Sequence, residues 1–331
     1  MGRFLRVVLG TLIILVLAAG VMLLMRGTGF DSVWYTDDAD AFRRESLPVE
    51  FTVATYNVQG RPLMDDTKGK FPEIGRRLEP FDIVGIQECF VDYDKLFEAA
   101  DFPAMVYHGT LRSRFKLVGS GLANMGRFPL LVAEDMEYSY ESMHFTTKGE
   151  PQNRPASKGI LLTRFDIGGH TLDVYNTHME AGGSEEAAKA RLQQVDELVA
   201  FVAANSPRAH SVIFMGDFNM RPLRDHHGPE EEDSKFVGFQ RMVNGLGEEF
   251  RDASDEIHGI PGPTNDENHD APWRRRPGGA EDIDRILFRA GEGVSLEPLT
   301  WHKHIEDFRG DDGDLLSDHD PVSVRFRLEA R

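Results

Sequence analysis

The segment Val212-Ile213-Phe214-Met215-Gly216-Asp217-Phe218-Asn219 changes character halfway along its length. Four apolar residues, typical of a strand buried on both faces, lead into a Gly-Asp-Phe-Asn ending in which an acid and an amide stand two positions apart. Taken alone, this ending has an ordinary explanation, because Asp and Asn often close Asx turns without any further role. A functional role for Asp217 and Asn219 is favoured because similar polar residues follow or precede other predicted strands.

Five further motifs place polar residues at the boundary of a strand-like run. They are Thr55-Tyr56-Asn57-Val58-Gln59-Gly60, Gly85-Ile86-Gln87-Glu88, Asn176-Thr177-His178-Met179, Ile283-Asp284-Arg285-Ile286 and Ser317-Asp318-His319-Asp320-Pro321. Strand ends on one side of a sheet converge in space, and α/β proteins bind their ligands there. We therefore expect these side chains to meet at one site.

Strand-like and helix-like segments alternate between these motifs. The best helix is residues 185–204, with Ser184 as its cap and two glutamates in its first turn. A second helix is expected over residues 73–78, and strands are expected over 51–56, 82–86, 159–165, 171–176, 212–215, 283–288 and 322–328. This order predicts a layered α/β or α+β domain.

Together, and in this order, the motifs over residues 51–328 resemble the endonuclease/exonuclease/phosphatase superfamily. The resemblance implies a four-layer α/β sandwich of the DNase I-like kind and a metal-dependent phosphoric ester hydrolase. The segment Gln152-Asn153-Arg154-Pro155-Ala156-Ser157-Lys158-Gly159-Ile160 is similar to the Lys-Gly segment of neutral sphingomyelinases. That similarity makes a phospholipid headgroup the expected substrate of a phosphodiesterase.

Hydrolysis of a phosphodiester needs a polarised phosphoryl oxygen and an oriented water. Hard oxygen ligands select Mg²⁺ or Mn²⁺, and Glu88 with Asn57 supplies a carboxylate and a carbonyl oxygen. The resemblance implies one or two metal ions in the site, and Asp318 is the candidate ligand for a second ion. Lys158 is expected to bind the substrate phosphate.

His319 can pair with Asp284, an arrangement that fixes the imidazole tautomer and raises its basicity. The resemblance assigns His319 as the general base. Asp217 is expected to act on the attacking water or the metal, and Asn219 on a phosphate oxygen. His178 is then expected to interact with the developing phosphorane or with the leaving oxygen.

Net charge and cysteine content narrow the range of binding partners and metal sites that the chain can have. The 37 Lys and Arg residues against 55 Asp and Glu residues give a net charge of -18, which disfavours loose binding of nucleic acid. The single cysteine, Cys89, excludes an intramolecular disulfide and a CxxC zinc site. Four cations, Arg112, Arg114, Lys116 and Arg127, keep a nuclease possible, although they equally suit anionic lipid headgroups.

The N-terminus predicts a membrane location. Residues 7–25 carry no charge and are long enough to span a bilayer as a helix. Arg3 and Arg6 precede this span, so the rest of the chain is expected outside the cytoplasm. We expect a membrane anchor in residues 1–30, a linker in 31–49 and the catalytic domain, as a monomer, in 50–331. The alternative for the first segment is a signal peptide that is cleaved to give a secreted protein.

The sequence is therefore consistent with three functions. The first is an anchored phospholipid phosphodiesterase of the sphingomyelinase or phospholipase C kind. The second is an extracytoplasmic endonuclease, exonuclease or small-molecule phosphatase of the same superfamily. The third, an inactive binding module, is the weakest, because every polar position that the superfamily mechanism needs is filled.

Overall fold

The computed structural model describes residues 32–35, 38–109, 118–139, 156–222, 234–259 and 282–331. These residues form two β-sheets. The strands of the first, in spatial order, are β1 (Ser32–Tyr35), β4 (Ala104–His108), β5 (Leu122–Gly126), β3 (Ile83–Cys89), β2 (Val49–Gly60), β13 (Val322–Ala330) and β12 (Val294–Lys303). Those of the second are β10 (Arg251–Asp252), β11 (Asp284–Arg289), β9 (Ser211–Asp217), β8 (His170–His178), β7 (Gly159–Ile167) and β6 (Leu130–Glu137).

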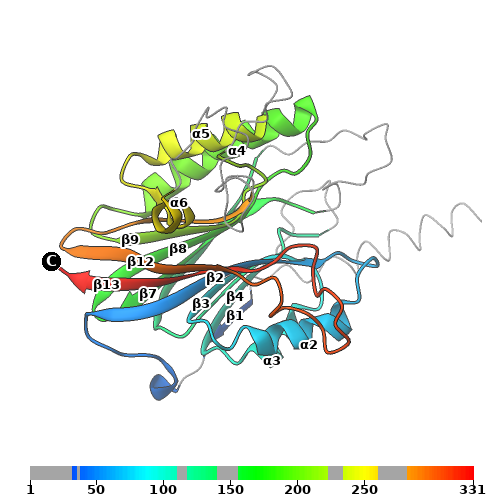
Figure 1. Cartoon of the computed structure of the whole chain (residues 1–331), viewed down its shortest axis with the longest axis horizontal. Coiled ribbons are helices and arrows are strands. Elements are labelled where there is room, and N and C mark those ends of the chain that lie inside the picture. Colours follow the sequence, from blue (N-terminus) through cyan, green and yellow to red (C-terminus); the bar gives the residue numbers. More distant parts are fainter. Residues whose placement is uncertain (1–31, 36–37, 110–117, 140–155, 223–233, 260–281) are drawn as a thin grey trace, which may run out of the picture.

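Helices cover the outer face of each sheet (Figure 1). The helices are η1 (Ala39–Ala41), α2 (Thr67–Arg77), α3 (Tyr93–Ala100), α4 (Glu185–Asn205), α5 (Ser234–Leu246) and α6 (Ala253–His258). Apolar residues of α2 and α3 pack on the first sheet, and those of α4 and α5 pack on the second. A third apolar cluster fills the space between the two sheets. The result is the expected mixed α/β sandwich of helix, sheet, sheet and helix.

The local expectations for the sheets and for the long helix agree with the structure. Strands β7 and β8 form the predicted hairpin, and its turn holds Gly168 and Gly169 at φ values of 65° and 84°. These left-handed backbone angles suit glycine. Helix α4 begins as predicted, because Ser184 Oγ accepts a hydrogen bond from the backbone N–H of Ala187 at 3.1 Å.

The segment expected as a linker is more ordered than the sequence indicates. Ser32–Tyr35 forms β1, which pairs antiparallel with β4. Farther on, Arg43 Nη1 lies 2.6 Å from Asp82 Oδ1, and Phe42 is buried. An edge strand offers unpaired backbone groups, so a neighbouring segment gains hydrogen bonds by adding to it. Residues 42–49 are therefore part of the domain rather than a free tether.

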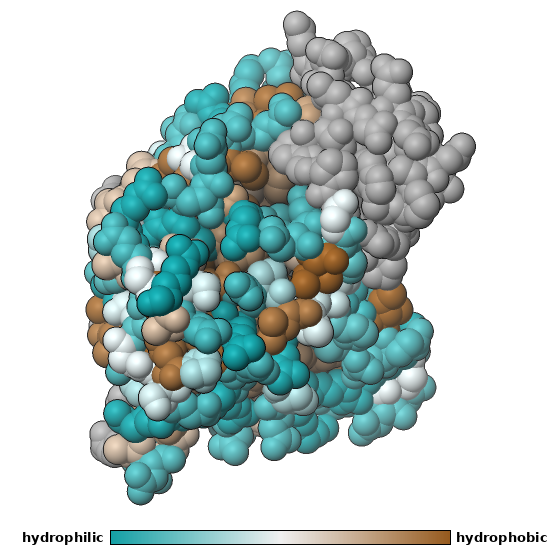
Figure 2. All heavy atoms as spheres, turned by 60° about the vertical axis from the view of Figure 1, so that its left-hand side comes forward, coloured by the Kyte–Doolittle hydropathy of each residue, from teal (hydrophilic) through white to brown (hydrophobic). Residues whose placement is uncertain are grey.

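The expected anchor, residues 7–25, lies outside the described residues. Within the described part of the chain, none of the helices combines the length and the apolar character needed to cross a membrane. Figure 2 shows one face of the molecule on which hydrophilic side chains dominate and apolar ones form small separate groups.

A buried polar network joins the two sheets. Gln87 Nε2 donates to Asn176 Oδ1 at 2.7 Å and to Thr55 Oγ1 at 2.9 Å. Asn176 Nδ2 donates back across the interface to the carbonyl oxygens of Ile86 and Ala123, at 2.9 and 3.0 Å. Because a buried polar atom without a partner is costly, this network allows only one alignment of the sheets.

Replacement of Asn176 should test this alignment. Asn176→Ala leaves the carbonyl oxygens of Ile86 and Ala123 and the amide of Gln87 without these partners, so the free energy of unfolding should fall by about 2 kcal/mol or more. Urea titration followed by circular dichroism measures the change. Asn205→Ala is the control, because Asn205 Nδ2 bonds only the Phe201 carbonyl at a helix end and its loss should cost less than about 1 kcal/mol. Equal losses in both variants would contradict the role of the network.

Candidate active site

The inner faces of the two sheets change from apolar to polar along their strands. Alternate residues of a strand point to the same face, so every second residue can be followed from the core to the edge. In order from core to edge, these are Val53, Thr55 and Asn57 of β2; Ile83, Gly85 and Gln87 of β3; Val174, Asn176 and His178 of β8; Ile213, Met215 and Asp217 of β9; and Phe288, Ile286 and Asp284 of β11. The predicted site residues therefore lie at one edge of the space between the sheets.

Strand register brings residues of the second sheet together. Asp217 of β9 stands opposite His178 on one side and Asp284 on the other. Across the space between the sheets, Asn57 Nδ2 donates to Asp217 Oδ2 at 3.1 Å. Asn57 Oδ1 accepts from the backbone N–H of Gln59 at 3.0 Å. Asp217 is thus the point at which the two sheets meet at the polar edge.

Two residues of the site have left-handed backbone angles. Glu88 has φ of 56° and Asn219 has φ of 49°. Strand alternation alone places Glu88 on the helix-covered face with Val84 and Ile86, and the positive φ breaks that alternation at the end of β3. At Asn219 the turn is held by its own backbone N–H, which donates to Asp217 Oδ1 at 3.0 Å. Strained backbone of this kind is often found at functional sites.

His319 is held by the acid that the sequence assigned to it. His319 Nδ1 lies 2.7 Å from Asp284 Oδ2, and His319 Nε2 lies 3.8 Å from Asp217 Oδ2. Ser317 positions the loop, because its hydroxyl donates to the Asn57 carbonyl at 2.7 Å and accepts from the His319 backbone N–H at 3.2 Å. Burial lowers the pKa of His319, but the charges of Asp284 and Asp217 outweigh burial and raise it to about 10.

His178 and Lys158 form a second buried pair. Lys158 Nζ donates to His178 Nε2 at 2.8 Å, and both residues are about 1% exposed. The same His178 nitrogen lies 3.4 Å from Asp217 Oδ2 and 3.9 Å from Glu88 Oε1. Burial, and then the charges of Lys158 and His319, lower the pKa of His178 well below its usual value. His178 is therefore a neutral imidazole, and the positive charge of this pair lies on Lys158.

The negative charges of the carboxylates in the site repel one another. Burial raises the pKa of Glu88, and the charge of Asp217 adds to that effect while Lys158 and His319 oppose it. Burial and the charge of Asp284 also raise the pKa of Asp217. Acids that share a small buried region repel one another when ionised. A bound cation relieves that repulsion.

Two groups of ligand atoms are available for such a cation. Glu88 and Asn57 offer the carboxylate and carbonyl oxygens that the sequence predicts. Asp217, Asp284 and His319 form another group, with ligand atoms within 4.8 Å of one another. Asp284 Oδ1 is buried and has no hydrogen-bond partner among the described residues, which fits an oxygen able to receive a cation or a water. The donor set at this edge therefore suits a hard divalent ion.

Asp318 lies at the exposed rim of the site. Its Oδ2 accepts from Gln59 Nε2 at 2.9 Å, and it is absent from the group formed by Asp217, Asp284 and His319. Its part in a second metal site stays a prediction.

The same rim contains cations that the motifs do not reveal. Lys70 Nζ donates to the Gln59 carbonyl at 2.7 Å. Burial lowers the pKa of Lys70, although the charges of Asp318 and Glu88 oppose that effect. The hydrogen bond to Asp65 raises the pKa of Arg61, and the charges of Asp318 and Glu88 add to it. A long side chain on α2 reaches the site only after the turn following β2 has folded back, which explains why strand-end patterns alone do not identify Lys70.

The remaining candidates are structural or lie outside the described residues. Cys89 is fully buried, and burial raises the pKa of its thiol. Arg127 donates to the carbonyl oxygens of Phe81, Asp101 and Glu79, so it holds the chain near the start of β3. The other members of its cationic cluster, Arg112, Arg114 and Lys116, are outside the described ranges.

Comparison with known proteins agrees with this fold. A sphingomyelinase of Mycobacterium bovis is 28% identical over 295 residues, which cover 86% of this chain and 54% of the relative. The chain thus spans about half the length of that curated relative.

Two solved structures share the fold at low sequence identity. The TDP2 structure from D. rerio, complexed with a single-strand DNA product, gives a TM-score of 0.57 at 18% identity over 84% of this chain and 98% of that one. Sphingomyelinase C from Streptomyces griseocarneus gives 0.54 at 19% identity, over 84% and 99% of the two chains. Residues 54–319 match the Endonuclease/Exonuclease/phosphatase family, and the chain belongs to that family.

Proposed function

We propose that the chain is a divalent-metal-dependent phosphodiesterase that releases the phosphorylated headgroup of a phospholipid, as a sphingomyelinase or a phospholipase C does. The observation that carries the proposal is the position of the His319–Asp284 pair beside Asp217, at the edge where Glu88 and Asn57 arrive from the other sheet. This arrangement combines a held imidazole with oxygen ligands for a cation. The similarity to sphingomyelinases supports the lipid substrate.

Glu88 and Asn57 would hold the metal ion, with Mg²⁺ as the proposed ion and Mn²⁺ as its substitute. When bound, such an ion supplies positive charge that stabilises the phosphoryl oxygens. Asp217 then orients the attacking water, because its carboxylate faces His319 Nε2.

His319 serves as the general base. Asp284 holds the Nδ1 proton, so Nε2 is the nitrogen that takes the proton from water. Since neighbouring carboxylates raise the pKa of His319 to about 10, the ring is charged when no cation is present. A divalent cation held by these carboxylates would oppose their field and so lower this pKa toward the neutral range in which a base operates.

Donors for the phosphate lie on the opposite side of Asp217. Lys158 brings a positive charge, and Asn219 brings polar hydrogens. His178 accepts from Lys158 through Nε2 and so positions that lysine. Asn219 Nδ2 donates to the Met179 carbonyl at 3.1 Å, which fixes the amide and leaves its second hydrogen for a phosphate oxygen. These groups match the charge that develops on the phosphoryl oxygens during hydrolysis.

The rim of the site supports a lipid substrate. Leu63 and Met64, in the turn after β2, are 95% and 62% exposed, and Arg61 precedes them. Apolar side chains beside cations suit a surface of acyl chains and phosphate groups. Residues 7–25 are the proposed membrane anchor, which would keep the domain at an extracytoplasmic surface and raise the local concentration of lipid.

The first prediction concerns stability and pH in the presence of a chelator. A pKa raised from 6.5 to about 10 stabilises the fold fully below about pH 6.5, and this stabilisation is lost as the pH rises through about 10. The difference in free energy of unfolding between wild type and His319→Gln should therefore shrink across that range in urea titrations. His170→Gln is the control, because burial lowers the pKa of His170 and its titration lies below this window. If the free energy of unfolding depended on pH in the same way for wild type and His319→Gln, the raised pKa of His319 would be disproved.

The second prediction tests the function with a panel of substrates. Purified protein with Mg²⁺ should release a phosphorylated headgroup from sphingomyelin or phosphatidylcholine vesicles faster than it cleaves single-stranded DNA. Chelator should abolish turnover. The Glu88→Gln variant should need a much higher Mg²⁺ concentration than wild type to reach half of its maximal activity. His319→Ala should lower kcat by about 10² to 10⁴. DNA cleavage without headgroup release would favour the nuclease, and full activity in chelator would remove the metal from the proposal.

The third prediction tests the rim. The double substitution Leu63→Ser, Met64→Ser should lower hydrolysis of vesicles about tenfold, equivalent to about 1.4 kcal/mol of lost apolar contact, and leave a soluble aryl phosphodiester unaffected. Leu131→Ser is the matched control: Leu131 is 52% exposed, but it lies near the end of β6 that faces Phe165, away from the polar edge. Equal loss on both substrates would mean that the pair shapes the site rather than contacts lipid.

A further inference from the structure

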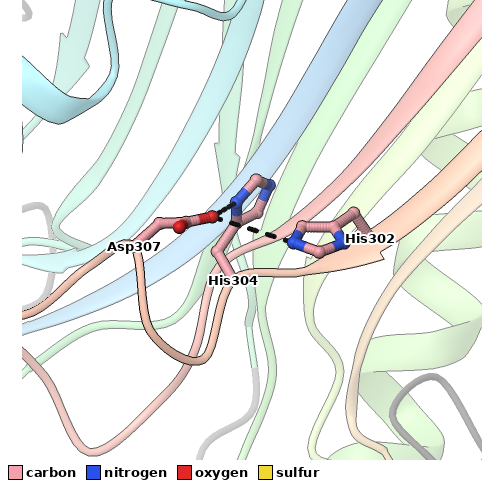
Figure 3. A group of neighbouring side chains, drawn as sticks. All are labelled: His302, His304 and Asp307. Atoms are coloured by element: carbon pink, nitrogen blue, oxygen red, sulfur yellow. Dashed lines mark hydrogen bonds and ion pairs between the residues drawn. The ribbon is translucent and has the colours of Figure 1, made fainter.

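Two histidines and an aspartate converge where the chain leaves β12 (Figure 3). His302 and His304 are two residues apart, which places both rings on one face of the extended chain. Asp307 returns toward them from the turn that follows. Asp307 Oδ2 lies 2.9 Å from His304 Nδ1 and 3.7 Å from His302 Nε2.

These distances suit a tetrahedral metal ion. Zinc bonds to histidine nitrogen and carboxylate oxygen are about 2.0–2.2 Å long, which separates neighbouring ligand atoms by about 3.4 Å in a tetrahedron. The observed separations fall on either side of that value, and one ligand atom from each of the three residues lies within 4.8 Å of the others. His302 and Asp307 are exposed, so their side chains have room to adjust to an ion.

His304 is prepared for the role of a ligand. Its Nε2 lies 2.8 Å from Ser323 Oγ, and its ring packs against Phe81 and Phe308 at centroid distances of 5.3 and 5.8 Å. Metal-bound histidines commonly donate their other nitrogen to such a partner, which fixes the ring and its tautomer. Burial lowers the pKa of His304, and the charge of His302 adds to that effect although Asp307 opposes it.

We propose that His302, His304 and Asp307 bind a transition-metal ion such as Zn²⁺, at a site that shares no residue with the catalytic cluster. Two imidazoles favour Zn²⁺ over Mg²⁺, whereas the oxygen ligands of Glu88 and Asn57 favour Mg²⁺. The two sites thus select different ions. With three protein ligands, the fourth position is left for water.

The place of this site in the fold suggests what the ion does. The His304 backbone N–H donates to the Pro321 carbonyl at 2.8 Å, so the segment 304–321 leaves and returns at one point. That segment includes Ser317, Asp318 and His319. An ion bound by His302, His304 and Asp307 ties the outgoing turn to β12 and thereby steadies the base of the loop that presents His319.

The test measures binding and needs no catalysis. Equilibrium dialysis of the full chain against micromolar Zn²⁺, with Mg²⁺ in large excess, should show one equivalent that is lost, or bound at least tenfold more weakly, in His302→Ala and Asp307→Asn. Both residues are about 60% exposed, so their substitution should leave the fold intact. Asp314→Asn, a change of an exposed acid in the same loop, is the control and should keep wild-type binding.

Thermal unfolding supplies a second readout. A ligand that binds only the folded state raises the melting temperature, and the increase grows with the logarithm of ligand concentration relative to Kd. Zn²⁺ should therefore stabilise wild type and Asp314→Asn but not His302→Ala or Asp307→Asn. Zinc that binds elsewhere, for instance to Asp217, Asp284 and His319, would remain in all four proteins. Unchanged zinc binding in His302→Ala and Asp307→Asn, or no binding by wild type, would overturn the proposal.

Discussion

The alignment of the two sheets is the constraint on which the site depends. Glu88 and Asn57 come from one sheet, and His178 and Asp217 come from the other, so a shift of one residue between the sheets would separate them. The network of Gln87 and Asn176 fixes that alignment just inside the site, where apolar contacts alone would tolerate sliding. Polar residues in this part of the core therefore specify the geometry of the chemistry, and the apolar cluster behind them supplies most of the stability.

Much of this arrangement could be predicted from the sequence, because strands repeat every two residues. The alternation that ends in Asn57 or in Asp217 is local, and so are the hairpin of β7 and β8 and the cap of α4. What could not be predicted depends on contacts between distant segments. The pairing of Ser32–Tyr35 with β4 needs an open edge that only the folded sheet presents. Lys70 reaches Gln59 because a turn folds back, and no spacing in the sequence encodes that approach.

Electrostatics explains how a protein of net charge -18 can accommodate a phosphate ester. The positive groups of the site are few and close together: Lys158 is buried beside His178, and Lys70 and Arg61 lie at the rim. Cations in an acidic surrounding act over a short range, so they suit one phosphate group rather than a long polyanion. His319 and Lys158 already oppose the charges of Asp217 and Asp284, and the proposed metal ion would add positive charge to the same cluster.

The loop between β12 and β13 connects the chemistry to the edge of the first sheet. Ser317 anchors it to β2 through the Asn57 carbonyl, and the His304–Pro321 hydrogen bond closes its base. His319 therefore lies between two anchored residues, Ser317 and Pro321, while Asp284, its partner, sits on a strand of the other sheet. If His319 is the base, as proposed, its action is sensitive to small movements of the loop, because catalytic geometry tolerates little displacement. The metal site proposed for His302, His304 and Asp307, at the foot of that loop, is thus well placed to influence the position of His319 without touching the substrate.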